Sequence, residues 1–241
     1  MRAIARVAAD RPDGGSLLLW AGMLLAVHPL LACSETVVFD LDGTLVLSHI
    51  EFPRLRSAAI ALADEVGYPV ESLEGLDSLA ISYRVSEWLP TAHREEFLRR
   101  AFEEFEAIEG EYAEGVSLRR GAMELLRALD DLGLAVGIAT RNSQRVAEKM
   151  VQDTGLPVRV IVGRDRVYRV KPEPEHVWAV VDALGMPRRN LCVIGDHYMD
   201  VRAGKNVGAG TVGVIPVGGT AEWFAPCPPD VTVRELIELI P

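Results

Sequence analysis

The spacing of apolar residues divides the chain into a helical stretch and a stretch in which strands and helices alternate. Between residues 53 and 118, apolar side chains recur at three- and four-residue steps, as at Leu55, Ala59 and Leu62, which predicts amphipathic helices. After Gly121, short apolar runs alternate with helical segments, several of which end near a glycine. This alternation predicts right-handed βαβ units and a parallel sheet.

The predicted sheet begins before the helical stretch, with a buried strand at 36–40 that ends in an acidic residue. The predicted fold is therefore α/β: residues 35–49 and 119–241 form the core, and residues 50–118 form a small all-helical insert after the first strand. The later strands are expected at 134–139, 158–162, 191–195 and 210–215, and the core helices at 119–132, 143–153, 174–184 and 233–240.

Residues 1–34 differ from the rest of the chain. Three arginines precede an apolar run at residues 17–33, and its ending, LLAC, resembles a lipoprotein signal with Cys33 as the lipidated residue. Two early aspartates dilute the positive region, and the run is short for a membrane span and contains a His-Pro pair. Three interpretations stay open: a wrongly assigned upstream extension, an export or anchoring signal, or a helix packed on the domain.

Composition narrows the classes of partner. The formal net charge is -10 and no basic stripe is present, so we expect no nucleic acid partner, and an anionic substrate must be held by local donors. The three cysteines form no CxxC pair, which predicts neither a zinc site nor a disulfide scaffold. We expect a cytoplasmic protein without a membrane partner; export or lipid anchoring through Cys33 is the alternative. The sequence leaves the oligomeric state open.

Polar residues follow two of the predicted strands directly. Asp40 and Asp42 lie two residues apart, and because neighbouring carboxylates disfavour joint ionisation, they indicate a hard divalent cation; a capped Asp-Gly turn is the structural alternative. Thr140, Arg141 and Asn142 precede a helix, where a hydroxyl and backbone N–H groups can bind phosphate or can cap the helix.

Two more strand ends carry charged residues. Lys171 can neutralise phosphate as a compact cation, or it is a surface lysine. Of Asp196 and Asp200, one can bind a metal ion and the other can hold Lys171 or cap the following helix. His197 is interpreted as a residue beside the site and not as a metal ligand, because magnesium prefers oxygen ligands. Carboxyl ends of parallel strands lie at one edge of a sheet, so we expect the four sets to form one site.

The segments FDLDGTL, the Thr140 strand end, Lys171-Pro172 and GDHYMD together resemble the four motifs of the haloacid dehalogenase-like (HAD) hydrolase superfamily, over roughly residues 36–217. The phosphoglycolate phosphatase-like branch, which carries a helical cap, looks most similar. The resemblance implies a Rossmann-like three-layer core with residues 50–118 as the cap. Asp42 favours a phosphatase over a dehalogenase, since a leaving alkoxide needs a proton and a halide does not.

The resemblance also implies a reaction: Mg2+-dependent hydrolysis of a small phosphorylated metabolite. It makes Asp40 the nucleophile that forms an aspartyl-phosphate, Asp42 the general acid and base, and Lys171 the neutralising cation. The expected phosphate-binding residues are Thr140, Arg141 and Asn142. The expected Mg2+ ligands are Asp40, Asp42 through its backbone carbonyl, and Asp196, with Asp200 supporting Lys171 or the metal shell.

Substrate recognition is expected in the cap, at His49, Arg54 and Arg56, with exposed arginines of a cap helix as the structural alternative. The first motif continues as VLSH where relatives often carry an acid, which weakens the transfer of a substrate from any one relative. Two other functions stay open. A phosphomutase of the β-phosphoglucomutase type would share the same catalytic residues, and a HAD-like binding protein would have no activity.

Overall fold

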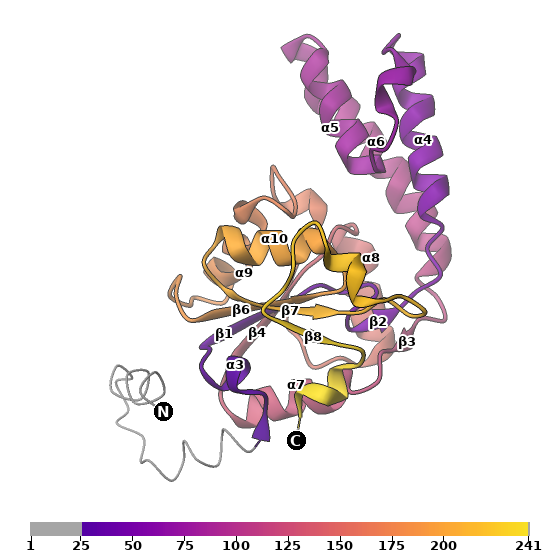
Figure 1. Ribbon diagram of the computed structural model, residues 1–241. Coiled ribbons are helices and arrows are strands. Elements are labelled where there is room, and N and C mark those ends of the chain that lie inside the picture. Colours follow the sequence, from indigo (N-terminus) through magenta and orange to yellow (C-terminus); the bar gives the residue numbers. More distant parts are fainter. Residues whose placement is uncertain (1–25, 241) are drawn as a thin grey trace. The chain divides into compact units, whose positions relative to one another are not determined.

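The computed structural model describes residues 26–240, and within them the chain forms two compact units. The core unit comprises residues up to Leu47 and from Ser117 onward; the insert unit is Ser48–Val116. Over the described residues, six parallel strands make the core sheet in the order β5-β4-β1-β6-β7-β8 (Figure 1). They are β1 (Thr36–Phe39), β4 (Ala135–Ala139), β5 (Val160–Val162), β6 (Leu191–Gly195), β7 (Gly210–Val214) and β8 (Val231–Val233).

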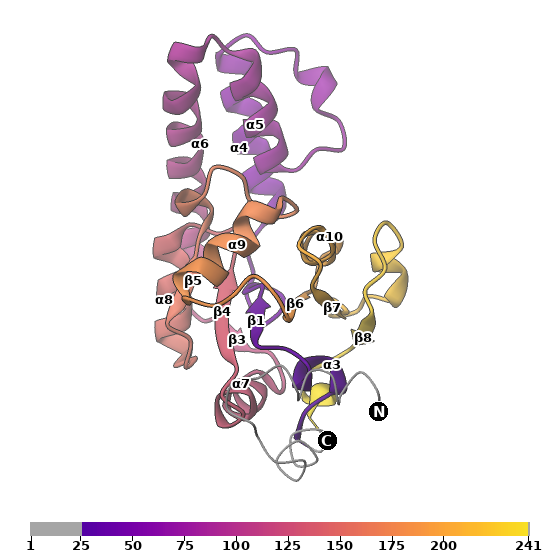
Figure 2. The same cartoon turned by 90° about the vertical axis from the view of Figure 1, so that its left-hand side faces the viewer.

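Helices cover both faces of this sheet. Helices α9 and α10 lie on one face and α7 lies on the other, so the core unit has three layers (Figures 1 and 2). The sequence directs this arrangement, because the central strand β1 is buried along its whole length and can only sit between two apolar layers. The core helices are α7 (Ala122–Asp131), α8 (Gln144–Thr154), α9 (Pro174–Ala183) and α10 (Tyr198–Asn206), with short 3-10 turns η2 (Arg164–Arg166) and η3 (Ala221–Phe224).

The insert unit is helical, as its apolar spacing predicts. Its interior is formed by side chains of three helices, including Leu62, Val85 and Phe105, all buried. It begins at Ser48 and ends at Val116, two residues before each predicted boundary. Its elements are α4 (Phe52–Glu65), η1 (Val70–Leu73), α5 (Ser78–Trp88) and α6 (Thr91–Tyr112).

A short ribbon in the core unit flanks the insert and explains the later boundary. Strand β2 (Val46–Leu47) pairs antiparallel with β3 (Ser117–Leu118), so the last two residues of the predicted cap belong to the core unit. Two residues on each side are too few to show an alternating pattern, which is why the sequence gives no sign of this ribbon.

The C-terminal segment corrects another expectation. Residues 233–240 were expected as a helix, but Val231–Val233 form β8, which pairs with β7, and only Leu236–Leu239 turn, as the 3-10 helix η4. The apolar spacing of this tail fits a strand followed by one tight turn as well as it fits a helix, and pairing with β7 decides between them. Helix α7 also begins later than expected, after Gly121 in a left-handed conformation.

The described part of the N-terminal segment is packed on the core unit. A short helix, α3 (Pro29–Ala32), buries Leu31 completely, and Leu30 lies against Gly210 of β7. The backbone N–H of His28 donates to the carbonyl of Leu239 at 2.8 Å. The core unit therefore begins before the predicted boundary at residue 35. The signal and anchor interpretations concern mainly residues 1–25, which lie outside the described residues.

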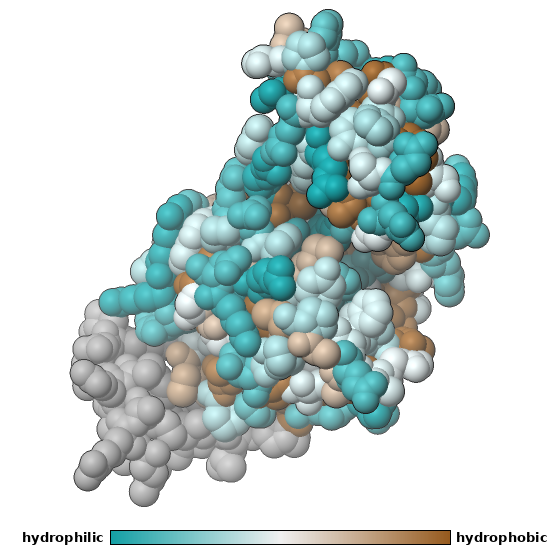
Figure 3. All heavy atoms as spheres, turned by 45° about the horizontal axis from the view of Figure 1, so that its top comes forward, coloured by the Kyte–Doolittle hydropathy of each residue, from teal (hydrophilic) through white to brown (hydrophobic). Residues whose placement is uncertain are grey.

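The surface in view in Figure 3 is mostly hydrophilic, with small scattered hydrophobic groups. No helix in residues 26–240 is long and apolar enough to cross a membrane. The large apolar side chains that are exposed are Phe52, Trp88, Leu118, Tyr168, Val217 and Trp223.

Candidate active site

The functional residues expected from the sequence gather at the carboxyl edge of the core sheet. Asp40 follows β1, and its backbone N–H donates to the carbonyl of Ile194 in β6 at 2.8 Å, so it continues the strand. Thr140 follows β4 and Asp196 follows β6. Parallel pairing of these three neighbouring strands brings their ends together, as expected for the ligand-binding edge of an open α/β sheet.

A buried lysine joins two of the acids. The Nζ of Lys171 lies 2.6 Å from Oδ1 of Asp40 and 2.7 Å from Oδ1 of Asp200, with the lysine side chain only 1% exposed. Burial alone would lower the pKa of Lys171, but Asp200 and Asp40 outweigh it and the pKa is raised. The ammonium therefore stays charged, and the surface-lysine alternative is excluded by its burial.

The carboxylates at this edge resist ionisation when no further cation is present. Burial raises the pKa of Asp40 to about 7, against the lowering effect of Lys171. Burial also raises the pKa of Asp196 well above its ordinary value, and the negative charges of Asp40 and Asp200 add to the shift. One lysine thus does not neutralise the cluster, and a second positive charge would stabilise it.

The donor set fits a hard divalent cation. Asp40, Asp196 and Asp200 each offer one carboxylate oxygen, and these oxygens lie within 4.8 Å of one another. An all-oxygen set of carboxylates is what Mg2+ binds in proteins. The Asp42 carboxylate is not in this group, as expected for a residue predicted to bind through its backbone carbonyl, and Asp42 is half-buried in the turn after β1.

The turn after Asp40 is fixed by contacts that need glycine and a buried arginine. Gly43 has a φ of 86°, and a Cβ at this position would collide with the Asp196 carboxylate, so only glycine lets the turn approach that acid. Arg119, 2% exposed, donates from Nη1 to the Gly43 carbonyl at 2.5 Å. The same guanidinium donates to the carbonyls of Ile215 and Arg234, which ties the turn to the C-terminal part of the core unit.

The Thr140 strand end is buried and is not a helix cap. Thr140 is 1% exposed, and its Oγ1 accepts a hydrogen bond from the backbone N–H of Asn142 at 3.2 Å. The cap of α8 is Ser143, whose side chain accepts from the N–H of Val146. The Arg141 guanidinium reaches the sulfur of Met199 in α10 at 3.4 Å, and so extends toward the segment that carries Asp196 and Asp200.

The segment after β6 combines a helix cap with the charge cluster. Asp200 accepts from the backbone N–H of His197 at 3.0 Å while its other oxygen pairs with Lys171, so it performs both roles that the sequence left open. The indole N–H of Trp223, on η3, donates to the carbonyl of Asp196 at 2.9 Å. The Trp223 ring also lies edge-on to His197, with centroids 5.5 Å apart.

Of the residues expected to recognise substrate, the two arginines form hydrogen bonds with other residues of the insert unit, and the histidine is exposed. Arg54 pairs with Glu111 at 2.8 Å and donates to the Tyr112 hydroxyl at 2.8 Å. Arg56 donates to two backbone carbonyls, those of Leu73 and Leu76. His49 is exposed. These contacts favour the structural alternative for both arginines over a role in substrate binding.

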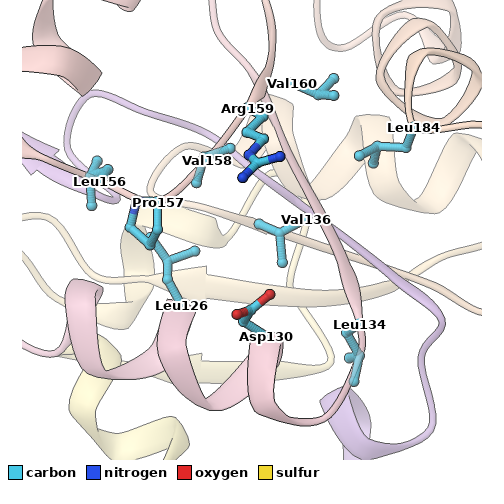
Figure 4. Close-up of a pocket in the computed structure, with 10 residues that line it drawn as sticks. All are labelled: Leu126, Asp130, Leu134, Val136, Leu156, Pro157, Val158, Arg159, Val160 and Leu184. Atoms are coloured by element: carbon cyan, nitrogen blue, oxygen red, sulfur yellow. The ribbon is translucent and has the colours of Figure 1, made fainter.

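A cavity of about 590 Å3 lies away from this chemistry. Figure 4 shows it at the amino ends of β4 and β5, the opposite edge of the sheet from Asp40, with Asp130 and Arg159 extending into it. Because ligands of such sheets bind at the carboxyl edge, the charge cluster and not this cavity marks the functional site.

Besides Arg119, sequence reasoning missed two further buried residues near the site. His176 is fully buried and contacts the backbone of Lys171, and Arg164 is 1% exposed and donates to the carbonyl of Arg141 at 3.1 Å. Each stands in a segment that carries other residues of the site, but a single histidine or arginine there has no distinguishing spacing, and nothing in the sequence separates it from a surface residue.

The fold and site define an α/β protein with a lysine-linked acidic cluster at the carboxyl edge of a parallel sheet. The family model of the haloacid dehalogenase-like hydrolases matches residues 35–208. The chain belongs to this family, which confirms the resemblance, the fold class and the expected hydrolase class.

Individual relatives agree with the family. The chain is 30% identical to the N-acetylmuramic acid 6-phosphate phosphatase of Pseudomonas aeruginosa, over 86% of this chain and 94% of that protein. It is 29% identical to the phosphoglycolate phosphatase of Salmonella choleraesuis, over 85% of this chain and 90% of that one. A solved hydrolase structure from Pseudomonas syringae has a TM-score of 0.59, with 23% identity, and covers 85% of this chain and 95% of its own. The similarity to curated phosphatases bears out the expected kind of enzyme.

Proposed function

We propose that this chain is a Mg2+-dependent phosphatase that hydrolyses a small phosphorylated metabolite through an aspartyl-phosphate on Asp40. The observation that carries the proposal is the contact between the Lys171 ammonium and the Asp40 carboxylate at 2.6 Å, inside the carboxyl edge of the sheet. The adjacent cation opposes the effect of burial on Asp40 and favours its ionised, nucleophilic form. The phosphatases among the similar curated proteins support the same reaction class.

In the first step, an oxygen of Asp40 attacks the phosphorus, and the bond between phosphorus and the leaving oxygen breaks. Asp42 donates its proton to that leaving oxygen, so that an alcohol departs instead of an alkoxide. Asp42 suits this role because it is half-buried two residues beyond the nucleophile, in the turn that Gly43 and Arg119 hold. Lys171 offsets the negative charge on Asp40 and on the transferring group.

In the second step, Asp42 removes a proton from water, which attacks the phosphorus of the aspartyl-phosphate. The bond between phosphorus and the Asp40 oxygen breaks, releasing phosphate and restoring the carboxylate. Thr140 and the backbone N–H groups near Arg141 and Asn142 would hold the phosphoryl oxygens, since they end the strand beside β1. The buried position of these groups keeps bulk water from weakening their hydrogen bonds.

Asp40, Asp196 and Asp200 would hold the Mg2+ ion, whose charge, when bound, lowers the barrier by stabilising negative charge on the phosphoryl oxygens. The raised pKa values of Asp40 and Asp196 support this assignment, because they come from burial first and from neighbouring carboxylates second, and a bound cation would offset both. Asp42 would contribute no carboxylate to the ion and would remain available for proton transfer.

The test is phosphate release from a panel of phosphorylated metabolites, including sugar phosphates, phosphoglycolate and a simple aryl phosphate, with Mg2+ and with EDTA. We expect release that requires Mg2+ and is lost in Asp40→Asn. The exposed Asp182→Asn, at the end of α9, is the matched control and should keep full activity. A folded protein that releases no phosphate, or release that persists in EDTA, would contradict the proposal; transfer of phosphate to a second sugar hydroxyl would identify a phosphomutase.

A further inference from the structure

A buried histidine links the proposed catalytic lysine to the strand end that would hold phosphate. His176 lies on α9, is 0% exposed, and is not among the residues that would contact substrate. Its Nδ1 lies 3.2 Å from the backbone nitrogen of Lys171, and its Nε2 lies 2.9 Å from the carbonyl oxygen of Val162, the last residue of β5. Helix α9 packs on β4 and β5 (Figure 2). The contact with Val162 therefore holds the ring between helix and sheet.

These two partners fix the tautomer of His176. A backbone N–H can only donate, so Nδ1 must present its lone pair to Lys171. A carbonyl oxygen can only accept, so the proton is on Nε2 and is donated to Val162. Burial agrees with this neutral form, because it lowers the pKa of His176 to about 3. Both polar atoms of the ring are thus used, and neither is left for substrate.

The carbonyl of Val162 joins this bridge to the phosphate-binding segment. It also accepts a hydrogen bond from the backbone N–H of Thr140 at 3.0 Å. One oxygen therefore receives a hydrogen bond from the end of β4 and another from His176, and His176 in turn receives the N–H of Lys171. The ring thus connects Lys171 directly to the Val162 carbonyl, and through that carbonyl to the Thr140 strand end.

The position of Lys171 matters because its ammonium contacts two carboxylates at once, at 2.6 and 2.7 Å. A side chain that must satisfy both distances depends on where its own backbone lies. A misplacement of about 1 Å can reduce turnover by about a hundredfold in an enzyme site. The backbone N–H of Lys171 itself is held by its hydrogen bond to His176.

We propose that His176 is a positioning residue that fixes the backbone of Lys171 relative to the Thr140 strand end and so sets the ammonium between Asp40 and Asp200. The proposal rests on the proposed phosphatase function for its effect on turnover, but the hydrogen bond itself does not depend on that function. If His176 served only to fill space in the core, the shape of its ring would matter and its two hydrogen bonds would not.

Two substitutions separate these roles. In His176→Asn, the amide oxygen occupies the place of Nδ1 and can accept from Lys171, whereas in His176→Gln the amide nitrogen occupies the place of Nε2 and retains only the bond to Val162. Both lose the ring and should destabilise the fold similarly. We expect His176→Gln to lower kcat by about ten- to a hundredfold, with KM changed less than about twofold, and His176→Asn to retain most of kcat.

The outcomes are distinct. Equal kcat losses in the two variants, or no loss in His176→Gln, would overturn the proposal. If neither variant folds, the 15N-labelled wild-type chain is tested by NMR for scalar coupling between the Lys171 backbone nitrogen and His176 Nδ1 across the hydrogen bond; coupling supports the proposal, and its absence or the opposite tautomer overturns it. If the wild type releases no phosphate, the proposed function is contradicted, but the proposed contact between His176 and Lys171 is not, because the NMR coupling tests that contact without turnover.

Discussion

The two units of the chain place opposite charges in different surroundings. In the core unit, the side chains of Lys171, Asp40 and Asp200 pair with at most 10% of any of them exposed. In the insert unit, Arg99 pairs with Glu96 and Glu103 while more than half of each side chain stays exposed. The distances are similar, at 2.5 to 2.7 Å, so geometry alone does not distinguish the two clusters.

The surroundings decide what each cluster can do. Water screens the exposed pairs, so they contribute little to stability. The buried cluster is expensive to form, and its pKa values are shifted because desolvated charges interact strongly. A chain retains such a cluster where the charges serve a site, and this contrast generates the predictions below.

The largest effect is expected at the buried lysine. Lys171→Met leaves Asp40 and Asp200 enclosed without their cation, so the free energy of unfolding should fall by about 3–5 kcal/mol. Urea unfolding in EDTA at pH 7 measures this, with metal excluded so that it does not replace the lost charge. The matched control is Lys149→Met, which removes an exposed ion pair to Asp153 on α8 and should leave the urea midpoint nearly unchanged. Equal effects of the two substitutions would break the comparison.

A smaller effect is expected from pH, through His176. The unfolded histidine binds a proton below about pH 6.5, whereas the folded one, with its pKa lowered to about 3, stays neutral. The unfolded state therefore binds more protons in this window, and stability falls as the pH falls from 6.5 toward 3.

Carboxylates also titrate in this pH range, but they do so in both wild type and His176→Asn. The difference in unfolding free energy between the two proteins therefore isolates the contribution of His176. It should shrink by about 2 kcal/mol between pH 7 and pH 5, because the variant lacks the titrating group. Chemical unfolding of both proteins across this range measures it. A difference that stays constant would mean that His176 is protonated in the folded protein.

The smallest effect is expected in the insert unit. Arg54→Gln removes a guanidinium that Glu111 and Tyr112 already hold, so kcat and KM should stay within about twofold of wild type. Arg99→Gln is the control for loss of an exposed charge in the same unit. Steady-state kinetics on the best substrate of the panel measures both. A KM that rises about tenfold in Arg54→Gln alone would restore Arg54 as a substrate-binding residue.

The sequence predicts the chemistry at the strand ends better than it predicts what holds that chemistry in place. Asp40, Thr140, Lys171 and Asp196 stand directly after apolar strands or before a helix, so their order along the chain is enough to bring them to one edge. His176 depends on tertiary contacts, because its two partners are known only once α9 is packed on the sheet.

The same limit explains the errors at the boundaries of elements. Strand β8 has three residues and β3 has two, and in both cases pairing with a distant strand defines the element. The apolar helix spacing of the insert was reliable because α4 and α6 each repeat it over several turns. The arginines there were the least predictable, since an exposed guanidinium near a first motif has the same sequence signature whether it binds substrate or a neighbouring glutamate.

The most direct test of the central claim is chemical trapping of the intermediate on Asp40. Borohydride reduces an acyl phosphate to an alcohol, so quenching the enzyme during turnover of its best substrate with Mg2+ should convert Asp40 to homoserine, detected by peptide mass spectrometry. Omitting the substrate, or using Asp40→Asn, should leave position 40 unreduced. Homoserine at position 40 is the predicted result; full phosphatase activity with Asp40 unmodified, or homoserine at another acid, would contradict the account.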